Sequence, residues 1–231
     1  MTRSILMALC LGMAGAASAA VRLTVIAGAA NYDAQGFVRI AGEIRNDGPE
    51  PVCAPGVAIG LADAAGKALS VKSVVTIAQQ ELGRSPRDGV LAARSWVLPG
   101  ESVPYTYRRD RNKIAGAPAG HQVVAVGRSC GETPPKLLIE NLQFGPDKVA
   151  SFLRVSGLVH NLGKTACRNA NLAIGFYDTA GRLIVAESTS GVDPEFTDLP
   201  AGSGTAFQRR SLPVPDGQTV AAVKVWGNCR L

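Results

Sequence analysis

The sequence predicts an all-β protein made of two tandem immunoglobulin-like β-sandwich domains, each holding one disulfide. Three observations carry this prediction. Residues 37–66 and 152–181 align at a constant offset of 115 and share 11 of 30 residues, where composition alone would give about two. Apolar residues in both copies alternate with a period of two, between turns rich in glycine and proline. Four of the five cysteines occupy matched places in the two copies.

The chain begins with the features of a secretory signal peptide. Residues 1–19 contain one positive charge, Arg3, then an apolar run, and the small residues Ala17 and Ala19 frame a cleavage site. The run is shorter than the ~20 apolar residues that span a bilayer, and no later run reaches that length. We therefore expect an exported protein, periplasmic or secreted, with no transmembrane segment.

The first shared strand covers residues 37–45 and 152–160. One side is apolar in both copies and the other is mixed, which predicts a strand with one buried face. The apolar side carries Val38, Ile40, Gly42 and Ile44, matched by Leu153, Val155, Gly157 and Val159. Asn46-Asp47-Gly48 and Asn161-Leu162-Gly163 follow, and Asn and Gly tolerate the left-handed backbone that a tight reversal uses.

A second apolar strand, at residues 57–61 and 172–176, ends in the turns Asp63–Gly66 and Asp178–Gly181. A further turn begins at Leu98-Pro99 and at Leu199-Pro200. It leads into a strand that ends in paired arginines, and a last apolar strand closes each copy. Several short strands in about 100 residues indicate a sandwich.

These repeats divide the exported chain into two domains, residues 20–130 and residues 136–231. Residues 131–135, Gly-Glu-Thr-Pro-Pro, form the linker. Two consecutive prolines make a short and stiff connection.

Four cysteines allow three pairings. Repeat symmetry favours one bridge inside each domain, Cys53 with Cys130 and Cys167 with Cys229, formed after export to an oxidising compartment. Loops of this length contribute about 4 kcal/mol in the loop-entropy account. The spacing contains no CxxC motif, so we interpret the cysteines as structural.

The turn residues resemble those of the FxLYD-type domains of bacterial envelope proteins. In the second copy the pattern is carried by Gly157, Asn161, Gly163, Phe176, Tyr177, Asp178, Gly181, Leu199, Pro200 and Gly202. The first copy departs from it, because Leu61-Ala62-Asp63 replaces Phe-Tyr-Asp. The resemblance covers about half of each repeat. It implies small extracytoplasmic β-sandwiches without a general enzymatic activity or an agreed ligand.

The residue inventory disfavours enzymes, metals and cofactors. All three methionines lie in the predicted signal peptide, and the chain has two histidines, His121 and His160, too few for a soft-metal site. His160 is expected on the mixed strand face and His121 in a loop. No Gly-x-Ser-x-Gly, phosphate-binding or His-Glu-x-x-His motif occurs. We expect a non-enzymatic protein without catalytic residues, metal or cofactor.

Arginine dominates the net charge of +6. Candidate binding residues lie in one dense basic segment and in an insertion of the first domain. They are Arg108, Arg109, Arg111 and Lys113 in the segment, and Arg84 and Arg87 in the loop from Glu81 to Gly89. Guanidinium groups recognise carboxylates and phosphates, so the expected partner is an envelope protein or an anionic envelope polymer. A plain solvated surface is the alternative. Export and 5% aromatic residues argue against nucleic acid.

The leading hypothesis is a non-enzymatic, exported binding or structural protein of the bacterial cell envelope, which interacts through its sandwich loops. The alternative is a periplasmic pilus-type assembly chaperone, since such chaperones also have two immunoglobulin-like domains. A hydrolase is a third possibility. Differences between the copies, including the acidic loop at residues 193–198, are the expected places for function.

Overall fold

The computed structural model describes residues 21–34, 36–72, 88–132, 134–148, 152–188, 198–211, 214 and 217–229. The predicted signal peptide, Arg84, Arg87 and residues 193–197 of the acidic loop lie outside this part. Within it, no helix has the length and the apolar composition that crossing a membrane requires. The one helical element there is a 3-10 turn, η1 (Arg111–Lys113).

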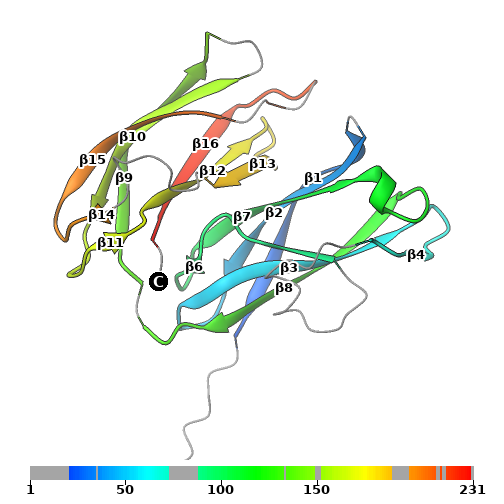
Figure 1. Cartoon of the computed structure of the whole chain (residues 1–231), viewed down its shortest axis with the longest axis horizontal. Coiled ribbons are helices and arrows are strands. Elements are labelled where there is room, and N and C mark those ends of the chain that lie inside the picture. The colour runs from blue at the N-terminus through cyan, green and yellow to red at the C-terminus, as the bar shows by residue number, and fades with distance from the viewer. Residues whose placement is uncertain are drawn as a thin grey trace, which may run out of the picture.

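Domain 1 is a sandwich of two antiparallel sheets (Figure 1). One sheet has the strand order β1-β2-β7, and in the other β3 pairs with β4, β5, β6 and β8. The strands are β1 (Leu23–Ala34), β2 (Phe37–Asn46), β3 (Val52–Ala62), β4 (Ala68–Leu69), β5 (Asp88–Leu91), β6 (Trp96–Val97), β7 (Ser102–Asp110) and β8 (Gly120–Ser129).

Domain 2 repeats this plan, with sheets β15-β10-β9 and β13-β12-β16 and a short pair, β11-β14. Its strands are β9 (Leu137–Pro146), β10 (Leu153–Asn161), β11 (Cys167–Arg168), β12 (Asn171–Tyr177), β13 (Leu183–Ser188), β14 (Asp198–Leu199), β15 (Gly204–Arg210) and β16 (Ala222–Asn228). Every sheet of the described residues joins strands from one repeat only. The protein is therefore all-β, with two tandem immunoglobulin-like sandwiches, as the sequence predicts.

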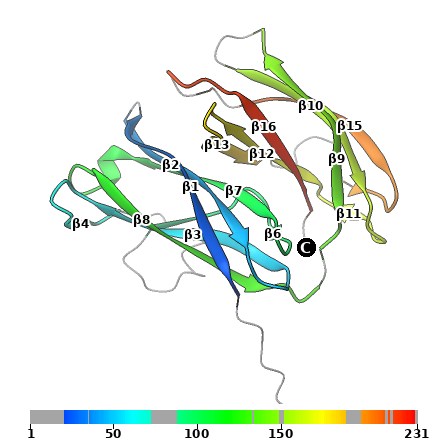
Figure 2. The ribbon, with the colours of Figure 1, turned by 180° about the vertical axis from the view of Figure 1, so that it is seen from behind.

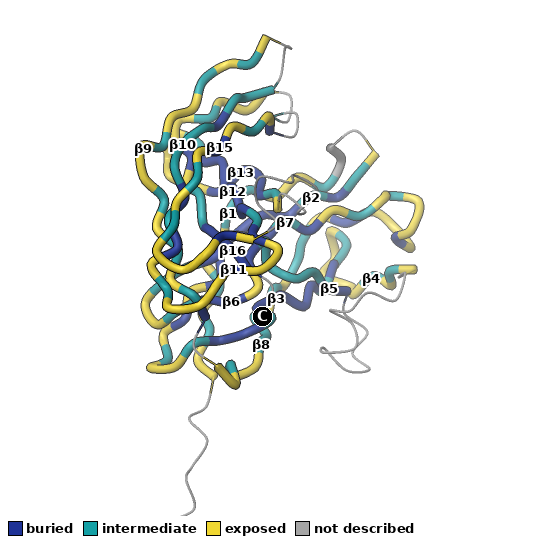
Figure 3. The backbone as a smooth tube through the Cα atoms, turned by 60° about the vertical axis from the view of Figure 1, so that its left-hand side comes forward, coloured by how far each residue is buried: buried dark blue, intermediate teal, exposed yellow. Residues whose placement is uncertain are grey.

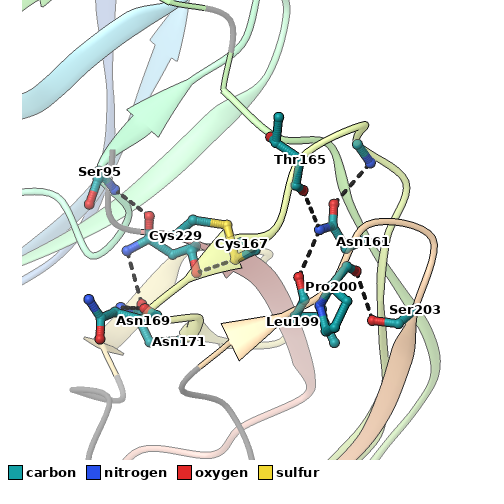
Figure 4. The surroundings of a disulfide bond; sticks show 12 residues. Ser95, Asn161, Thr165, Cys167, Asn169, Asn171, Leu199, Pro200, Ser203 and Cys229 are labelled. Atoms are coloured by element: carbon teal, nitrogen blue, oxygen red, sulfur yellow. Dashed lines mark hydrogen bonds between the residues drawn. A yellow bond between two sulfur atoms is a disulfide. The ribbon is translucent and has the colours of Figure 1, made fainter.

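The repeated asparagines are buried connectors between two turns. The Asn161 side chain donates from Nδ2 to the carbonyl oxygens of Thr165 (2.8 Å) and Leu199 (2.9 Å), and Oδ1 accepts from the Gly163 amide (2.9 Å; Figure 4). Asn46 makes the same three kinds of bond in domain 1. Each asparagine thus ties its own turn to the strand end before the Leu-Pro turn.

The physical reason expected for these turns is wrong, although the turns are present. Positive φ angles occur elsewhere, and neither Asn161 nor Gly163 adopts one. A Cβ atom at Gly163 would lie 3.0 Å from Asn161 Oδ1. Glycine is used here because it lets the asparagine side chain approach the backbone closely.

The Asp-x-x-Gly turns follow the sequence prediction. Asp63 Oδ1 accepts hydrogen bonds from the amides of Ala65 and Lys67, both at 2.9 Å. The fourth residue, Gly66, has φ of 79°, a left-handed value that glycine adopts without strain. Asp178 and Gly181 repeat the arrangement in domain 2.

The disulfides are Cys53–Cys130 and Cys167–Cys229, the pairing that repeat symmetry favours. The first bridge lies at the junction of the domains. Cys53 and Trp96 belong to the same hydrophobic cluster as the core of domain 2. Beside it, the Ser95 amide donates to Asn228 Oδ1 at 3.0 Å (Figure 4).

The two sandwiches also meet face to face. Opposite views show β13 of domain 2 beside the β1-β2-β7 sheet of domain 1 (Figures 1 and 2), and buried segments gather there (Figure 3). Ala41 of β2 packs in a cluster with Tyr177, Leu183 and Ala186. The prediction that the first shared strand buries only one face is therefore wrong for domain 1, because domain 2 covers the centre of the other face.

A buried carboxylate lies in this contact. Glu43, 7% exposed, accepts a hydrogen bond from the hydroxyl of Tyr177 at 2.7 Å and another from the hydroxyl of Ser102. The ammonium of Lys224 lies 3.6 Å from Glu43 Oε1. Burial and the bond to Glu43 raise the pKa of Tyr177, so the phenol stays a donor to the carboxylate.

Candidate functional site

The neighbouring arginines at the end of β7 lie on opposite faces of the strand. Successive side chains of a strand point to opposite faces, so Arg108 and Arg109 do not act together. Arg108 is exposed on the outer face, whereas Arg109 turns toward the other sheet. The prediction that these neighbouring arginines form one basic segment for binding is therefore wrong, and the alternation of a strand is the reason.

Arg109 is part of a buried structural contact. Its Nε lies 2.5 Å from Oδ2 of Asp88, a residue on β5 that is 2% exposed. The same oxygen accepts from the Tyr107 hydroxyl at 3.1 Å. Burial and the Asp88 charge raise the pKa of Tyr107. Arg109 therefore connects the two sheets of domain 1.

The outer face carries Arg108 together with Arg39 and Phe37. Arg39 of β2 and Arg108 of β7 are Cα partners in the antiparallel ladder, so both side chains point to the same face. The guanidinium carbon of Arg108 lies 3.7 Å from the centre of the Phe37 ring, a close cation–π contact. We call Phe37, Arg39 and Arg108 the arginine pair site.

The charges in this site affect one another. Burial lowers the pKa of Arg39, and the neighbouring Arg108 guanidinium lowers it further. Like charges directly opposite each other on one sheet face destabilise the pair. An anion placed between the two side chains would remove this repulsion and accept their N–H donors.

The other residues that were predicted to bind are not part of the arginine pair site. Arg111 begins η1 and donates from Nη1 to the Gly116 carbonyl at 2.9 Å. Lys113 is exposed at the end of the same turn. Arg84 and Arg87 lie outside the described residues. The candidate site therefore keeps Arg108 from the prediction and adds Arg39 of β2, which was not among the predicted binding residues.

The histidines are separate and each has its own neighbour. His121, expected in a loop, lies in β8, and its Nδ1 is 2.6 Å from the hydroxyl of Tyr32. Burial lowers the pKa of His121. His160, on the outer face of β10, has Nε2 3.2 Å from Glu140. Across the described part of the chain, no three His, Cys, Asp or Glu side chains are grouped as metal ligands.

A groove of about 530 Å³ follows the edges of β1 and β8. Each of these strands pairs on one side only in the described sheets, β1 with β2 and β8 with β3. The lining residues are Val21, Leu23, Ala125, Val126, Gly127 and Arg128. Edge strands present backbone groups to which an extended segment can bond.

No protein family model matches the chain, and no curated protein matches it significantly. Among solved structures, the chain is similar to red sea bream transglutaminase, with 8% identity, a TM-score of 0.26, and coverage of 90% of this chain and 31% of that one. It is also similar to the N-terminal CBM22-1-CBM22-2 tandem domain of Paenibacillus barcinonensis Xyn10C, with 10% identity, a TM-score of 0.18, and coverage of 93% and 92%. The chain spans less than a third of the transglutaminase. TM-scores this low carry no argument about function.

Proposed function

We propose that the protein is a non-enzymatic, exported binding or structural component of the bacterial cell envelope that holds an anionic group of another envelope component. The observation that carries the proposal is the arginine pair site. Arg39 and Arg108 are Cα partners on the outer face of β2 and β7, and the Arg108 guanidinium carbon lies 3.7 Å from the centre of the Phe37 ring. Arginine in such a setting is suited to carboxylate and phosphate.

The surroundings of the site support binding over catalysis. Arg39 and Arg108 project from paired strands of a sheet whose centre is buried against domain 2, so they are held on a rigid support. The two histidines belong to different domains and contact a tyrosine and a glutamate. Binding an anion requires no catalytic side chain in addition to these arginines. The two disulfides are compatible with export.

Retention of envelope components on the immobilised protein tests the proposal. Arg39→Gln/Arg108→Gln should reduce retention at least tenfold, and raising the salt from about 0.1 to about 1 M should do the same, because the Debye length falls from about 10 to about 3 Å. Arg22→Gln/Arg168→Gln, which removes two exposed arginines outside the site, is the charge-matched control. Equal retention by all three proteins would contradict the proposal.

The groove along β1 and β8 favours a second candidate, a pilus-type assembly chaperone that captures a subunit by strand addition. In that case an extended segment would add to an exposed sheet edge. Gly127→Pro in β8 should abolish capture of a secreted subunit, whereas the double arginine variant should leave it unchanged. The opposite pattern would exclude this candidate.

A further inference from the structure

The arginine pair site has a counterpart in domain 2. Arg154 of β10 and Arg210 of β15 are Cα partners, as Arg39 and Arg108 are in domain 1. A phenylalanine accompanies each pair, since the Arg210 guanidinium carbon lies 5.8 Å from the ring centre of Phe152. Both copies therefore place Phe-x-Arg on one strand and a second arginine on its neighbour.

In domain 2 the pair holds a carboxylate. Asp147 Oδ2 lies 3.5 Å from Arg154 Nη2, and Oδ1 lies 3.3 Å from Arg210 Nη2. The Asp147 side chain is 2% exposed. Its amide donates to the Phe152 carbonyl at 3.0 Å. One aspartate thus bridges two guanidinium groups.

Domain 1 has a shorter connection at this place. Residues 147–152 separate β9 from β10, whereas only residues 35 and 36 separate β1 from β2. Among the described residues, no carboxylate forms a hydrogen bond or ion pair with Arg39 or Arg108. Within the described residues, Arg39 and Arg108 therefore lack the bridging carboxylate that Asp147 provides in domain 2.

We infer that the arginine pair site binds a carboxylate presented by an acidic loop of a protein partner, in the way that Arg154 and Arg210 bind Asp147. The occupant follows from the internal example, which is an aspartate of the polypeptide directly after β9. The Phe37 ring orients the Arg108 guanidinium, and Arg39 supplies the second donor. The inference rests on the proposed binding function and names its site and the chemistry of its ligand.

NMR of the arginine Nε–Hε groups tests the site directly. Titration of the purified protein with acetate at constant ionic strength should give saturable shifts at Arg39 and Arg108. Arg108→Gln should weaken binding at least tenfold, because it removes one of two charge-assisted donors. Arg168→Gln should leave the affinity unchanged. Shifts spread evenly over exposed arginines would overturn the inference.

Removing the internal ligand provides a second measurement. Asp147→Ala should expose Arg154 and Arg210, so that acetate shifts appear at two additional arginines and the stoichiometry rises from one to two. Circular dichroism confirms that the variant is folded. A folded Asp147→Ala protein that still binds at a single site would overturn the inference.

Three further probes identify the source of the carboxylate. The peptide Gly-Pro-Asp-Lys, blocked at both ends, should bind at least tenfold more tightly than acetate. Inorganic phosphate and an oligogalacturonate should not exceed acetate, and tighter binding of either would overturn the assignment to a polypeptide. Acetate binding without any envelope retention would contradict the proposed function alone. Envelope retention without acetate shifts would contradict this inference alone.

Discussion

At the scale of single residues, the fold depends on buried asparagines whose side chains are hydrogen-bonded to the backbone. Asn161 is fully buried, and its side chain makes three hydrogen bonds to backbone groups of two turns. A buried polar atom that loses its partner costs more than the bond itself contributes. These asparagines are therefore as important to the sandwich as the apolar residues beside them.

Asn161→Ala leaves two carbonyl groups and one amide without their side-chain partner. We expect a loss of about 2–4 kcal/mol in the free energy of unfolding, measured by urea denaturation. Asn112→Ala, an exposed residue of η1, is the control and should change stability by less than about 0.5 kcal/mol. Equal effects of the two substitutions would show that the hydrogen bonds of Asn161 contribute nothing.

His121 should make stability depend on pH near neutrality. Burial lowers the pKa of His121 below the ordinary histidine value of about 6.5, so the unfolded chain takes up the proton first as pH falls. Stability is therefore complete above the unfolded pKa and decreases as pH falls from about 6.5 toward the folded value. NMR titration of the His121 ring checks the direction, and His121→Gln should flatten the unfolding free energy over that window.

At the scale of elements, the strands are held in place by shape as well as by alternation. A Cβ atom at Gly42 of β2 would lie 2.6 Å from the Tyr105 hydroxyl and 2.7 Å from the Ile26 carbonyl. The aligned Gly157 meets Phe207 of β15 in the same way. The glycine shared by the two copies makes room for an aromatic residue of the neighbouring strand.

Gly42→Ala should therefore destabilise the protein by about 3 kcal/mol, because the methyl group overpacks the sheet. Gly60→Ala in β3 is the matched control, since a Cβ atom there meets nothing within 4 Å. Its effect should be neutral or slightly stabilising. Thermal unfolding of both variants measures the difference, and similar melting temperatures would contradict the packing argument.

The sequence was sufficient for the strands and turns that the two copies share, but it did not predict β1 and β9 or the contacts across the chain. Alternation, the Asp-x-x-Gly turns and the matched cysteines predicted the strands, the reversals and both disulfides. The burial of Ala41 and Glu43 depends on domain 2, and nothing in the local pattern of β2 indicates it. Likewise, the register of β2 and β7 brings Arg39 and Arg108 together. The two copies share Phe-x-Arg, but this motif does not determine the register.

At the scale of the whole molecule, the contact that Glu43 makes between the two domains has no equivalent in the second copy. The position aligned with Glu43 is Leu158 in the second copy, so domain 2 does not offer the same carboxylate to a further domain. Glu43, Tyr177 and Lys224 connect β2 to β12 and β16. The domains should therefore unfold together.

Tyr177→Phe removes the principal hydrogen bond of Glu43 across the domain contact. We expect a loss of about 2 kcal/mol and a calorimetric transition that separates into two. Lys224→Gln is the control, because its partner is 3.6 Å away and its side chain is 57% exposed, so its effect should stay below about 1 kcal/mol. A single, unshifted transition in Tyr177→Phe would show that the domains are coupled by other contacts.

The positions of the two bridges also determine how far the molecule can be stretched. When the unfolded chain is stretched between Val21 and Cys229, each disulfide carries the force past the residues that it encloses. The stretched path therefore consists of residues 21–53, residues 130–167 and the two disulfides. That path extends to about 230 Å, whereas the reduced chain would extend to about 700 Å. Under load the oxidised protein therefore behaves as a short tether, and reduction would roughly triple its reach.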